Sequence, residues 1–428
     1  MVQTFKKGPD YIDPMWLGHA SGRYCYNLDF YTMSASEITD KFSQHMHSAD
    51  IGIIEGNKGL YDGLDLDGSN SNAALAKQLQ APVVLVIDSR GMTRGIAPLV
   101  LGYQNFDKDI NIRGVILNQV GGSRHESKLR AILEHYTDVT VLGAVHKNSM
   151  INIDERHLGL TPSNEDTFAD NKIKVIADSI RAQVDLQDLI SIAKTAPTEP
   201  CIELDAIIDT PQFSDKVKVG IFHDEAFGFY YPDDIDALKN AGADIIYINS
   251  LTEKSLPEID GLFIGGGFPE ARMQELSANT SMRNAVFTAI DNGLPTYAEC
   301  GGLMYLARKI QWQGQSSEMV GVIDGDIMMH DKPQGRGYIQ LSQNESHPWP
   351  VKTNDKIFAH EFHYSSLDNL STEYPYAYKV LRGTGINGKE DGLIYKNLLA
   401  NYAHLRNTDS CPWAQSFIDK IVKINKQK

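Results

Sequence analysis

The sequence predicts an α/β protein of two domains, and three observations carry this prediction. Short β-branched runs alternate with stretches of helical periodicity through the first half of the chain. A stretch containing Pro197, Pro200 and Pro211 then separates this half from a second series of strand-like runs. A chain of 428 residues with 42% hydrophobic and 22% charged residues is long enough for two or three domains and is typical of a soluble enzyme.

The first half contains the elements of a doubly wound parallel sheet. Strand-like runs lie at residues 51–55, 83–88, 113–118 and 139–145, and helical spacing of apolar residues appears at 34–47, 72–80, 94–102 and 125–135. Such alternation is typical of a parallel sheet with helices on both faces. Residues 1–195 are therefore predicted to form the first domain.

The second domain begins after a linker at residues 196–215. Strand signals restart at residues 217–222 and continue at 244–249, 261–264 and 294–298, after which short strands become frequent toward the C-terminus. Residues 216–428 are therefore predicted to form a second α/β domain.

The composition excludes several classes of protein. The longest dense apolar runs, such as residues 81–87, have the length of a strand, and residues 1–14 lack the apolar region of a signal peptide. We therefore expect a cytoplasmic protein without a membrane span. The net charge of −15 argues against a nucleic-acid partner. The four cysteines contain no CxxC pair, which argues against disulfides and zinc and leaves Cys300 a free thiol.

Cys300 lies where a strand is predicted to turn sharply into a helix, in residues 298–303 (AECGGL). Glycines directly after a reactive side chain permit a tight turn and expose backbone N–H groups that can stabilise an anion. A buried, inert cysteine is the other reading, because most free cysteines are of that kind. The local pattern leaves both open, and the context favours a nucleophile.

That context is a glycine-rich loop at residues 265–270 (GGGFPE), about one βα unit before Cys300. Bare backbone near a nucleophile predicts an oxyanion site, to which Gly266, Gly267 and Gly301 could contribute. A nucleophilic thiol also needs a base. The histidines of this domain that could serve are His330, His347, His360, His363 and His404, and sequence spacing does not choose among them.

Four ordered segments of the second half resemble the class I glutamine amidotransferase domain of the cobyrinic acid a,c-diamide synthase family. They are residues 294–306 (LPTYAECGGLMYL), 265–270, 360–365 (HEFHYS) and 401–405 (NYAHL). The resemblance implies that Cys300 attacks the amide of glutamine and that His404 is its partner, with His363 as second choice. The usual carboxylate two residues after that histidine is replaced by Arg406, so a Cys–His dyad is expected.

The first half resembles the synthetase domain of the same family, which is P-loop-NTPase-like and similar to dethiobiotin synthetase. The matching strings are residues 6–14 (KKGPDYIDP), 27–29 (NLD), 55–63 (EGNKGLYDG) and 156–160 (RHLGL). The resemblance implies catalytic roles for Glu55 and Asp62, with Glu55 also holding the Mg²⁺ of ATP, and substrate binding by Asp10 and Tyr11. Asn118 resembles a nucleotide-base contact, although a loop asparagine is equally ordinary.

The family's first βα unit, a strand, a Walker A phosphate loop and a helix, is missing. Residues 2–6 resemble the strand that follows it. We expect a truncated or misassigned start, the alternatives being a unit on another polypeptide and an inactive synthetase. Residues 383–390 (GTGINGKE) have the spacing of a phosphate loop, but Glu390 replaces the Ser or Thr that would hold Mg²⁺. A hairpin turn is expected there.

The resemblance implies a glutamine-hydrolysing carbon–nitrogen ligase. Such an enzyme uses ATP, Mg²⁺ and glutamine to amidate the a and c acetate carboxylates of cobyrinic acid, in cobalamin biosynthesis, through an acyl phosphate. One alternative is amidation of sirohaem or another sirohydrochlorin-type tetrapyrrole in a sulfur oxidiser, and another is a glutaminase or regulatory subunit without its own ATP chemistry. The expected partners are the tetrapyrrole, glutamine and ATP; a homodimer is compatible with the sequence, which does not determine the oligomeric state.

Overall fold

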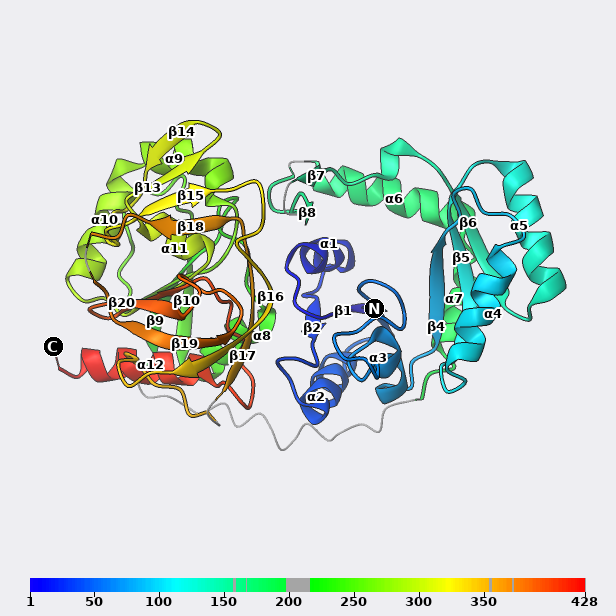
Figure 1. Ribbon diagram of the computed structural model, residues 1–428, viewed down its shortest axis with the longest axis horizontal. Helices are drawn as coiled ribbons and strands as arrows, with labels where there is room; N and C mark the ends of the chain where they lie inside the picture. The colour runs from blue at the N-terminus through cyan, green and yellow to red at the C-terminus, as the bar shows by residue number, and fades with distance from the viewer. Residues whose placement is uncertain (157–158, 167, 198–215, 354–355, 372, 428) are drawn as a thin grey trace. The chain divides into compact units, whose positions relative to one another are not determined.

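The computed structural model describes residues 1–156, 159–166, 168–197, 216–353, 356–371 and 373–427 (Figure 1). It divides into two compact units, residues 1–30 with 35–203 and residues 31–34 with 204–428. His157, Leu158 and Cys201, together with most of the predicted linker at 196–215, lie outside the described residues.

The first unit alternates parallel strands with helices, as its sequence predicts. Its main strands are β1 (Val2–Lys7), β2 (Tyr26–Leu28), β3 (Ile51–Glu55), β4 (Val83–Asp88), β5 (Ile112–Val120) and β6 (Thr140–His146). Its helices are α1 (Ile12–Ser21), α2 (Ala35–Met46), α3 (Asn72–Gln78), α4 (Ile96–Phe106), α5 (Ser123–Tyr136), α6 (Ala169–Gln183) and α7 (Leu186–Ala193). A short 3-10 helix, η1 (Ser149–Ile151), and a small hairpin of β7 (Glu155–Arg156) and β8 (Gly159–Leu160) precede α6.

The strands of this unit form two parallel sheets rather than one. Their orders are β2-β1-β3 and β4-β5-β6, so β3 and β4 each have one edge that pairs with no strand of the described residues. Apolar side chains on these two strands are unusually accessible, with Ile53 46% and Val86 64% exposed. Strands of parallel sheets are normally buried on both faces.

The second unit is centred on a nine-stranded sheet of order β10-β9-β11-β12-β21-β20-β19-β16-β17. The five strands from β10 to β21 are parallel, and the others are antiparallel. These strands are β9 (Val217–Phe222), β10 (Ala243–Ile248), β11 (Gly261–Ile264), β12 (Thr296–Glu299), β16 (Gly335–Gln343), β17 (Ile357–His363), β19 (Tyr376–Arg382), β20 (Glu390–Tyr395) and β21 (Leu398–Asn401). A smaller sheet of order β14-β13-β15-β18 contains β13 (Lys309–Trp312), β14 (Gln315–Glu318), β15 (Asp326–Met329) and β18 (Ser365–Asp368).

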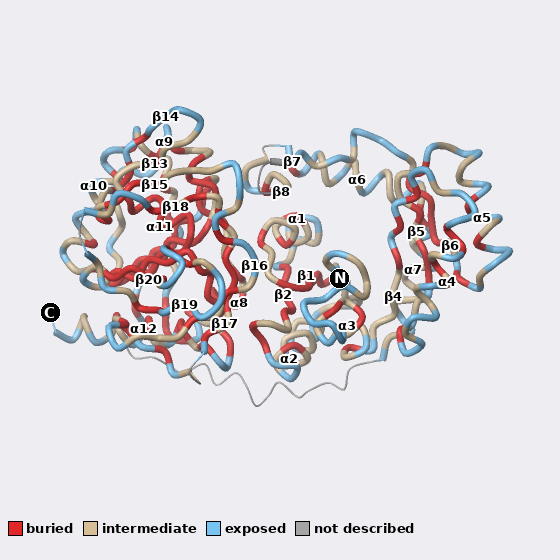
Figure 2. Tube along the Cα trace, viewed as in Figure 1, coloured by how far each residue is buried: buried red, intermediate tan, exposed pale blue. Residues whose placement is uncertain are grey.

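Two hydrophobic cores cover the two faces of the parallel strands, and Figure 2 colours much of this region as buried. The alternation along β11 shows this directly, because Leu262 and Ile264 belong to one core and Phe263 to the other. The helices α9 (Met273–Ala278), α10 (Thr280–Asp291) and α11 (Gly301–Leu306) supply the first core, and α8 (Pro232–Asn240) and α12 (Trp413–Asn425) the second. The fold class predicted from the sequence is thus confirmed.

Residues 383–390, which have the spacing of a phosphate loop, connect the antiparallel strands β19 and β20, as predicted. Two backbone amides of this connection donate hydrogen bonds to a carboxylate. Glu361 is 2% exposed and accepts hydrogen bonds from the amides of Thr384 (2.7 Å) and Gly385 (2.8 Å). A buried carboxylate therefore stands where a phosphate would have to bind.

Among the described residues, no helix combines the length and the apolar character needed to cross a membrane.

Candidate active sites

Cys300 occupies a sharp turn between β12 and α11. Its φ of +47° is uncommon for a residue with a side chain, and its backbone N–H donates to the carbonyl of Asn401 (2.7 Å), which ends the neighbouring strand β21. A Cβ at Gly302 would lie 2.2 Å from the carbonyl oxygen of Ile264, so glycine is required for α11 to approach β11 this closely. The structure thus has the strand–turn–helix geometry predicted around Cys300.

The glycine loop lies against both Cys300 and His404. The Cβ position of Gly301 is 3.0 Å from the backbone nitrogen of Gly267, and that of Gly266 is 2.6 Å from Cε1 of His404. Gly267 has a φ of +155°, and a Cβ there would lie 2.1 Å from the carbonyl oxygen of Ala226. The fold therefore brings the three predicted oxyanion glycines into one cluster with the cysteine and this histidine.

His404 follows β21 and is 3% exposed. Its backbone N–H donates to the carbonyl of His360 (2.8 Å), and the two imidazoles stack with centroids 4.8 Å apart. The turn before it is fixed by Asp391, which accepts from the amides of Tyr402 (3.0 Å) and Ala403 (2.9 Å). Burial raises the pKa of Asp391 to about 6 against the opposing effect of these hydrogen bonds.

His363 lies in a different environment. Its ring stacks on Tyr402 with centroids 3.8 Å apart, its Nδ1 donates to the carbonyl of Ser365 (2.8 Å), and its Nε2 lies 3.8 Å from Glu361. Because His404 contacts the glycine loop, the geometry favours His404 over His363 as the partner of Cys300.

Two of the other histidines, His330 and His347, form hydrogen bonds with side chains of neighbouring strands. His330 hydrogen-bonds Ser366 (2.8 Å), which lies on β18 in the smaller sheet. His347 is 5% exposed; its Nε2 contacts the Tyr378 hydroxyl (2.8 Å), and its Nδ1 accepts from the amide of Trp349 (3.2 Å). Burial lowers the pKa of His347 to about 4, so this imidazole is neutral in the folded protein at pH 7.

We expect His347 to make the second unit less stable in acid. Its pKa is lowered from 6.5 to about 4 on folding, so the unfolded chain takes up a proton first as the pH falls below 6.5. The free energy of unfolding should fall by about 3 kcal/mol when the pH approaches 4. Denaturant unfolding followed by tryptophan fluorescence measures it. His347→Gln, which cannot take up this proton, should flatten the pH dependence, and an unchanged slope would contradict the assignment.

Burial raises the pKa of the Cys300 thiol, and the charges of Glu270 and then Glu299 raise it further, against a hydrogen bond from the Gly301 amide that lowers it. The thiol is therefore protonated at neutral pH. Its reaction with an amide needs a base that removes the proton as the sulfur attacks.

Sequence reasoning missed a carboxylate beside His404. Glu299, the residue before Cys300, is 2% exposed and places Oε2 3.5 Å from Nδ1 of His404. Arg406, which occupies the expected carboxylate position, instead pairs with the buried Asp233 (2.6 Å). The pattern of alternating faces along β12 does not reveal a contact with a residue more than a hundred positions later.

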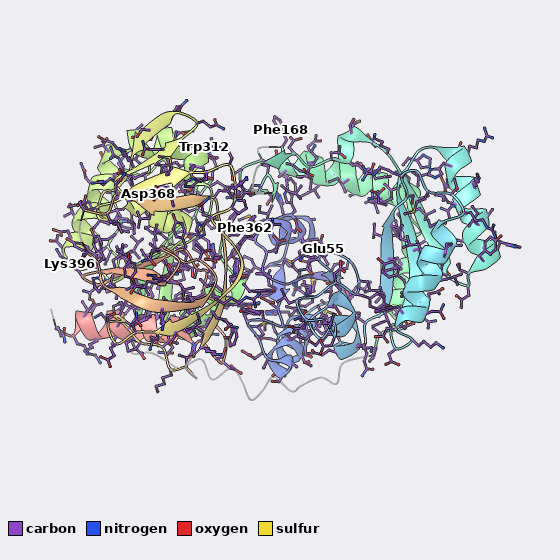
Figure 3. The ribbon with its side chains drawn as sticks, in the orientation of Figure 1. Glu55, Phe168, Trp312, Phe362, Asp368 and Lys396 are labelled. Carbon is purple, nitrogen blue, oxygen red and sulfur yellow. The ribbon has the colours of Figure 1, made fainter. Side chains whose placement is uncertain are left out.

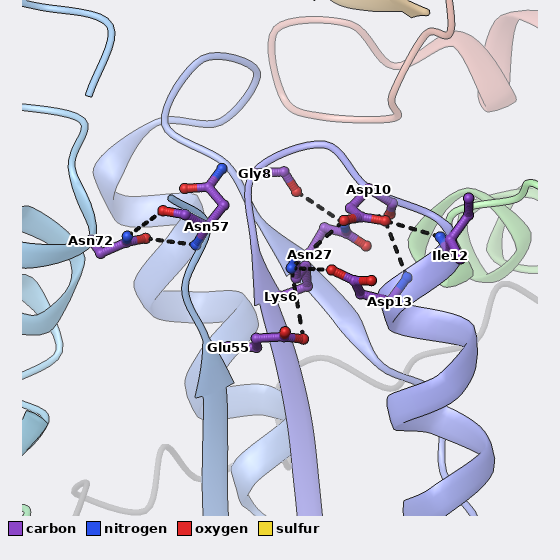
Figure 4. Close-up of polar contacts among 9 residues, drawn as sticks. All are labelled: Lys6, Gly8, Asp10, Ile12, Asp13, Asn27, Glu55, Asn57 and Asn72. Carbon is purple, nitrogen blue, oxygen red and sulfur yellow. Dashed lines mark hydrogen bonds and ion pairs between the residues drawn. The ribbon is translucent and has the colours of Figure 1, made fainter. Parts of the chain in front are cut away.

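In the first unit, three carboxylates surround the buried ammonium group of Lys6 (Figure 4). Its Nζ lies 2.5 Å from Asp13, 3.6 Å from Asp10 and 3.6 Å from Glu55. Burial alone would lower the pKa of Lys6, but Glu55, Asp13 and Asp10 outweigh it and raise this pKa. Sequence reasoning selected Asp10 and Glu55 but missed Lys6 and Asp13.

Glu55, labelled in Figure 3, ends β3. Its side chain is 43% exposed, so a ligand can reach its carboxylate. Burial raises its pKa and Lys6 opposes that shift. Asp10 has a second contact: its Oδ1 accepts from the amides of Ile12 (2.9 Å) and Asp13 (3.2 Å) at the start of α1. Burial, followed by the charge of Asp13, raises the pKa of Asp10 to about 6.

The other residues predicted for this unit are Tyr11, Asp62 and Asn118. Tyr11 is buried directly before α1. Asp62 accepts from the amide of Gly59 (2.9 Å) and so closes the loop that follows β3. Asn118 lies in the other sheet, where its carbonyl accepts from the amide of Ser89 (2.9 Å) and its side chain from Gln119 (2.9 Å).

Within the described part of the chain, no group of three or more His, Cys, Asp or Glu side chains is arranged to hold a metal ion. Mg²⁺ in nucleotide enzymes commonly takes only one or two carboxylates and completes its coordination with phosphates and water. The accessible carboxylate of Glu55 fits that limited donor set.

Comparisons with known proteins define the class and then the family. Residues 218–410 match the model of the CobB/CobQ-like glutamine amidotransferase domain, and residues 25–153 match that of an AAA domain. The chain is therefore a glutamine-dependent carbon–nitrogen ligase with an AAA-type first half and an amidotransferase second half.

Relatives named cobyrinate a,c-diamide synthase match nearly the whole chain. The protein of Magnetococcus marinus is 42% identical over 97% of this chain and 89% of its own length. That of Archaeoglobus fulgidus is 38% identical over 99% of this chain and 91% of its own length. The chain belongs to the cobyrinate a,c-diamide synthase family.

Proposed function

We propose that this protein uses ATP and glutamine to convert the a and c acetate carboxylates of cobyrinic acid into amides, in cobalamin biosynthesis. The observation that carries the proposal is the cluster of Cys300, His404 and the glycine loop, which has the parts that amide cleavage by a thiol requires. The names of the relatives support the tetrapyrrole substrate. We place the reaction in the cytoplasm, where ATP and glutamine are both available.

In the proposed glutaminase reaction, Sγ of Cys300 attacks the side-chain amide carbon of glutamine while His404 takes the thiol proton. The backbone amides of Gly266, Gly267 and Gly301 stabilise the oxyanion. When the C–N bond breaks, His404 gives the proton to the leaving nitrogen, and ammonia departs. Water then hydrolyses the thioester to glutamate and regenerates the thiol.

In the proposed synthetase reaction, a substrate carboxylate attacks the γ-phosphorus of ATP and forms an acyl phosphate with loss of ADP. Ammonia then attacks the acyl carbon, and inorganic phosphate leaves. Glu55 would hold Mg²⁺, which when bound neutralises phosphate charge. Lys6 fixes the carboxylates of Glu55 and Asp10, while Asp62 shapes the adjoining loop. We further propose Tyr11 and Asp10 for substrate binding and Asn118 for the adenine base.

The test is an assay of the purified chain with cobyrinic acid, MgATP and glutamine, followed by mass spectrometry of the corrin. We expect amidation that stops when ATP is omitted, with sirohaem as the competing substrate in a parallel reaction. Glutamine hydrolysis without any change in cobyrinic acid would contradict the proposal.

The division of the first unit's sheet favours a second candidate function, a glutaminase or regulatory subunit that lacks its own ATP chemistry. Phosphate loops follow a strand of such a sheet, and β3 and β4 each have an edge that pairs with no strand of the described residues. Calorimetric titration with MgATP separates the candidates. Measurable ATP affinity supports the ligase, whereas persisting glutaminase activity without ATP affinity supports the subunit.

A further inference from the structure

The buried histidine next to the glycine loop needs a group that fixes its ring, and Arg406 is not that group. Its guanidinium pairs with Asp233 (2.6 Å) and lies over the ring of Tyr231, 4.9 Å from the centroid. The carboxylate that usually follows the histidine by two residues therefore has no equivalent at position 406.

Glu299, which precedes His404 in the sequence, lies beside the imidazole of His404. Its Oε1 accepts from the hydroxyl of Tyr297 (2.5 Å) and from the amide of Leu405 (2.9 Å), the residue next to His404. These two donors hold one carboxylate oxygen in place. The other, Oε2, lies 3.5 Å from Nδ1 of His404.

Other buried carboxylates near this region have different partners. Asp391 accepts from backbone amides at Tyr402, Ala403 and Gly392, and Glu361 accepts from the loop amides of Thr384 and Gly385. Among the described residues, Glu299 is the carboxylate that forms an ion pair with His404.

We propose that Glu299 is the positioning residue of the catalytic histidine, so that the site is a triad whose acid directly precedes the nucleophile in sequence. This inference rests on the proposed glutaminase function. Glu299 holds Nδ1 of His404 and leaves Nε2 to take the thiol proton. It stabilises the imidazolium that forms when Cys300 attacks, and the proton remains on His404 rather than moving to the carboxylate.

Before glutamine binds, the carboxylate of Glu299 has an unfavourable effect on ionisation of the Cys300 thiol. Its negative charge contributes to the raised pKa of Cys300 and so disfavours a thiolate before glutamine binds. Removal of the charge should therefore slow glutamine hydrolysis without slowing reaction of the free thiol. A residue that only supports the fold would not separate these two rates.

The experiment compares Glu299→Gln with Glu299→Asp in the full-length protein. Gln keeps the length and an oxygen that can accept from Tyr297 and Leu405, but it lacks the charge. We expect kcat for glutamine hydrolysis to fall about 10²-fold with little change in KM. Alkylation of Cys300 by iodoacetamide, followed by peptide mass spectrometry, should be as fast as in the wild type or faster. Asp, which keeps the charge, should be at least about tenfold more active than Gln.

Three results would overturn the inference: kcat of Glu299→Gln within about twofold of wild type, equal loss in the Asp and Gln variants, or a loss matched by slower alkylation. If Glu299→Gln does not fold, Tyr297→Phe removes a hydrogen bond to Oε1 and should still lower kcat several-fold; an unchanged kcat then overturns the inference. Failure of the proposed function is a separate result: a wild-type protein that does not hydrolyse glutamine would contradict the glutaminase function itself, and hydrolysis by Cys300→Ser would contradict the role of Cys300 as nucleophile.

Discussion

Cys300→Ser should abolish glutamine hydrolysis and glutamine-dependent amidation while ammonia-dependent amidation continues. A serine hydroxyl has a much higher pKa than a thiol and is a far weaker nucleophile toward an amide at this site. The expected loss of glutaminase kcat is on the order of 10³-fold or more. The synthetase reaction proposed for the first half can use ammonia from any source, so ammonium chloride at alkaline pH should restore product. Glutamate release and corrin amidation, measured separately, give the two rates.

Cys411→Ser is the matched control for this experiment. Cys411 is also a free, buried thiol of the second unit, and burial raises its pKa to about 12. The same exchange of sulfur for oxygen should leave glutaminase activity near wild type there. If both variants lose activity together, or if Cys300→Ser also loses ammonia-dependent amidation without unfolding, the separate roles of the two halves are contradicted.

The fold could be predicted from the sequence because its signals are local. The run at residues 217–222 coincides with β9, and the strands predicted at 51–55 and 83–88 coincide with β3 and β4. The division of the first unit into two sheets could not be predicted from periodicity, because strand order depends on pairing between distant segments. The same is true of Glu361, which fills a loop more than twenty residues later.

Those parts of the candidate site that depend on neighbouring residues in the sequence could be predicted, and those that depend on contacts between distant segments could not. Two glycines beside Cys300 indicate the turn, and the structure gives a physical reason for Gly302 in its approach to Ile264. His404 was chosen through a family resemblance, since spacing alone left five histidines. Glu299 was missed because a strand residue that precedes a nucleophile looks like part of the core pattern, and only the packing of β12 on the turn after β21 brings it to His404.

The two halves differ in how many of the residues proposed for their reactions lie close together. The second unit holds Cys300, His404, Glu299 and the glycine loop within one buried cluster. The first unit holds a buried lysine among carboxylates, but its two sheets have edges on β3 and β4 that no described strand covers. Glutaminase activity is therefore the property that this chain should show most directly, and ATP-dependent activity is the more demanding test.

Glu55→Gln should have the reverse effect of Cys300→Ser. Glu55 is the accessible carboxylate at the carboxyl end of β3, and Lys6 is 3.6 Å away. The amide keeps the shape of the side chain but cannot supply a negative charge to Mg²⁺ or to the ammonium group of Lys6. We expect ATP-dependent amidation, with glutamine or with ammonia, to fall about 10²-fold or more, while glutamate release stays within about twofold of wild type.

Glu134→Gln makes the same chemical change at an exposed position of α5 in the same half, and it should leave both rates unchanged. A thermal melt shows whether the loss of charge beside Lys6 merely unfolds the first unit. If Glu55→Gln keeps full ATP-dependent activity, Glu55 neither holds the metal nor aligns Lys6. If it lowers glutamate release as strongly as amidation, the two reactions do not occur at independent sites. A selective loss of amidation would place the ATP chemistry at the end of β3, beside the lysine that the sequence pattern alone did not single out.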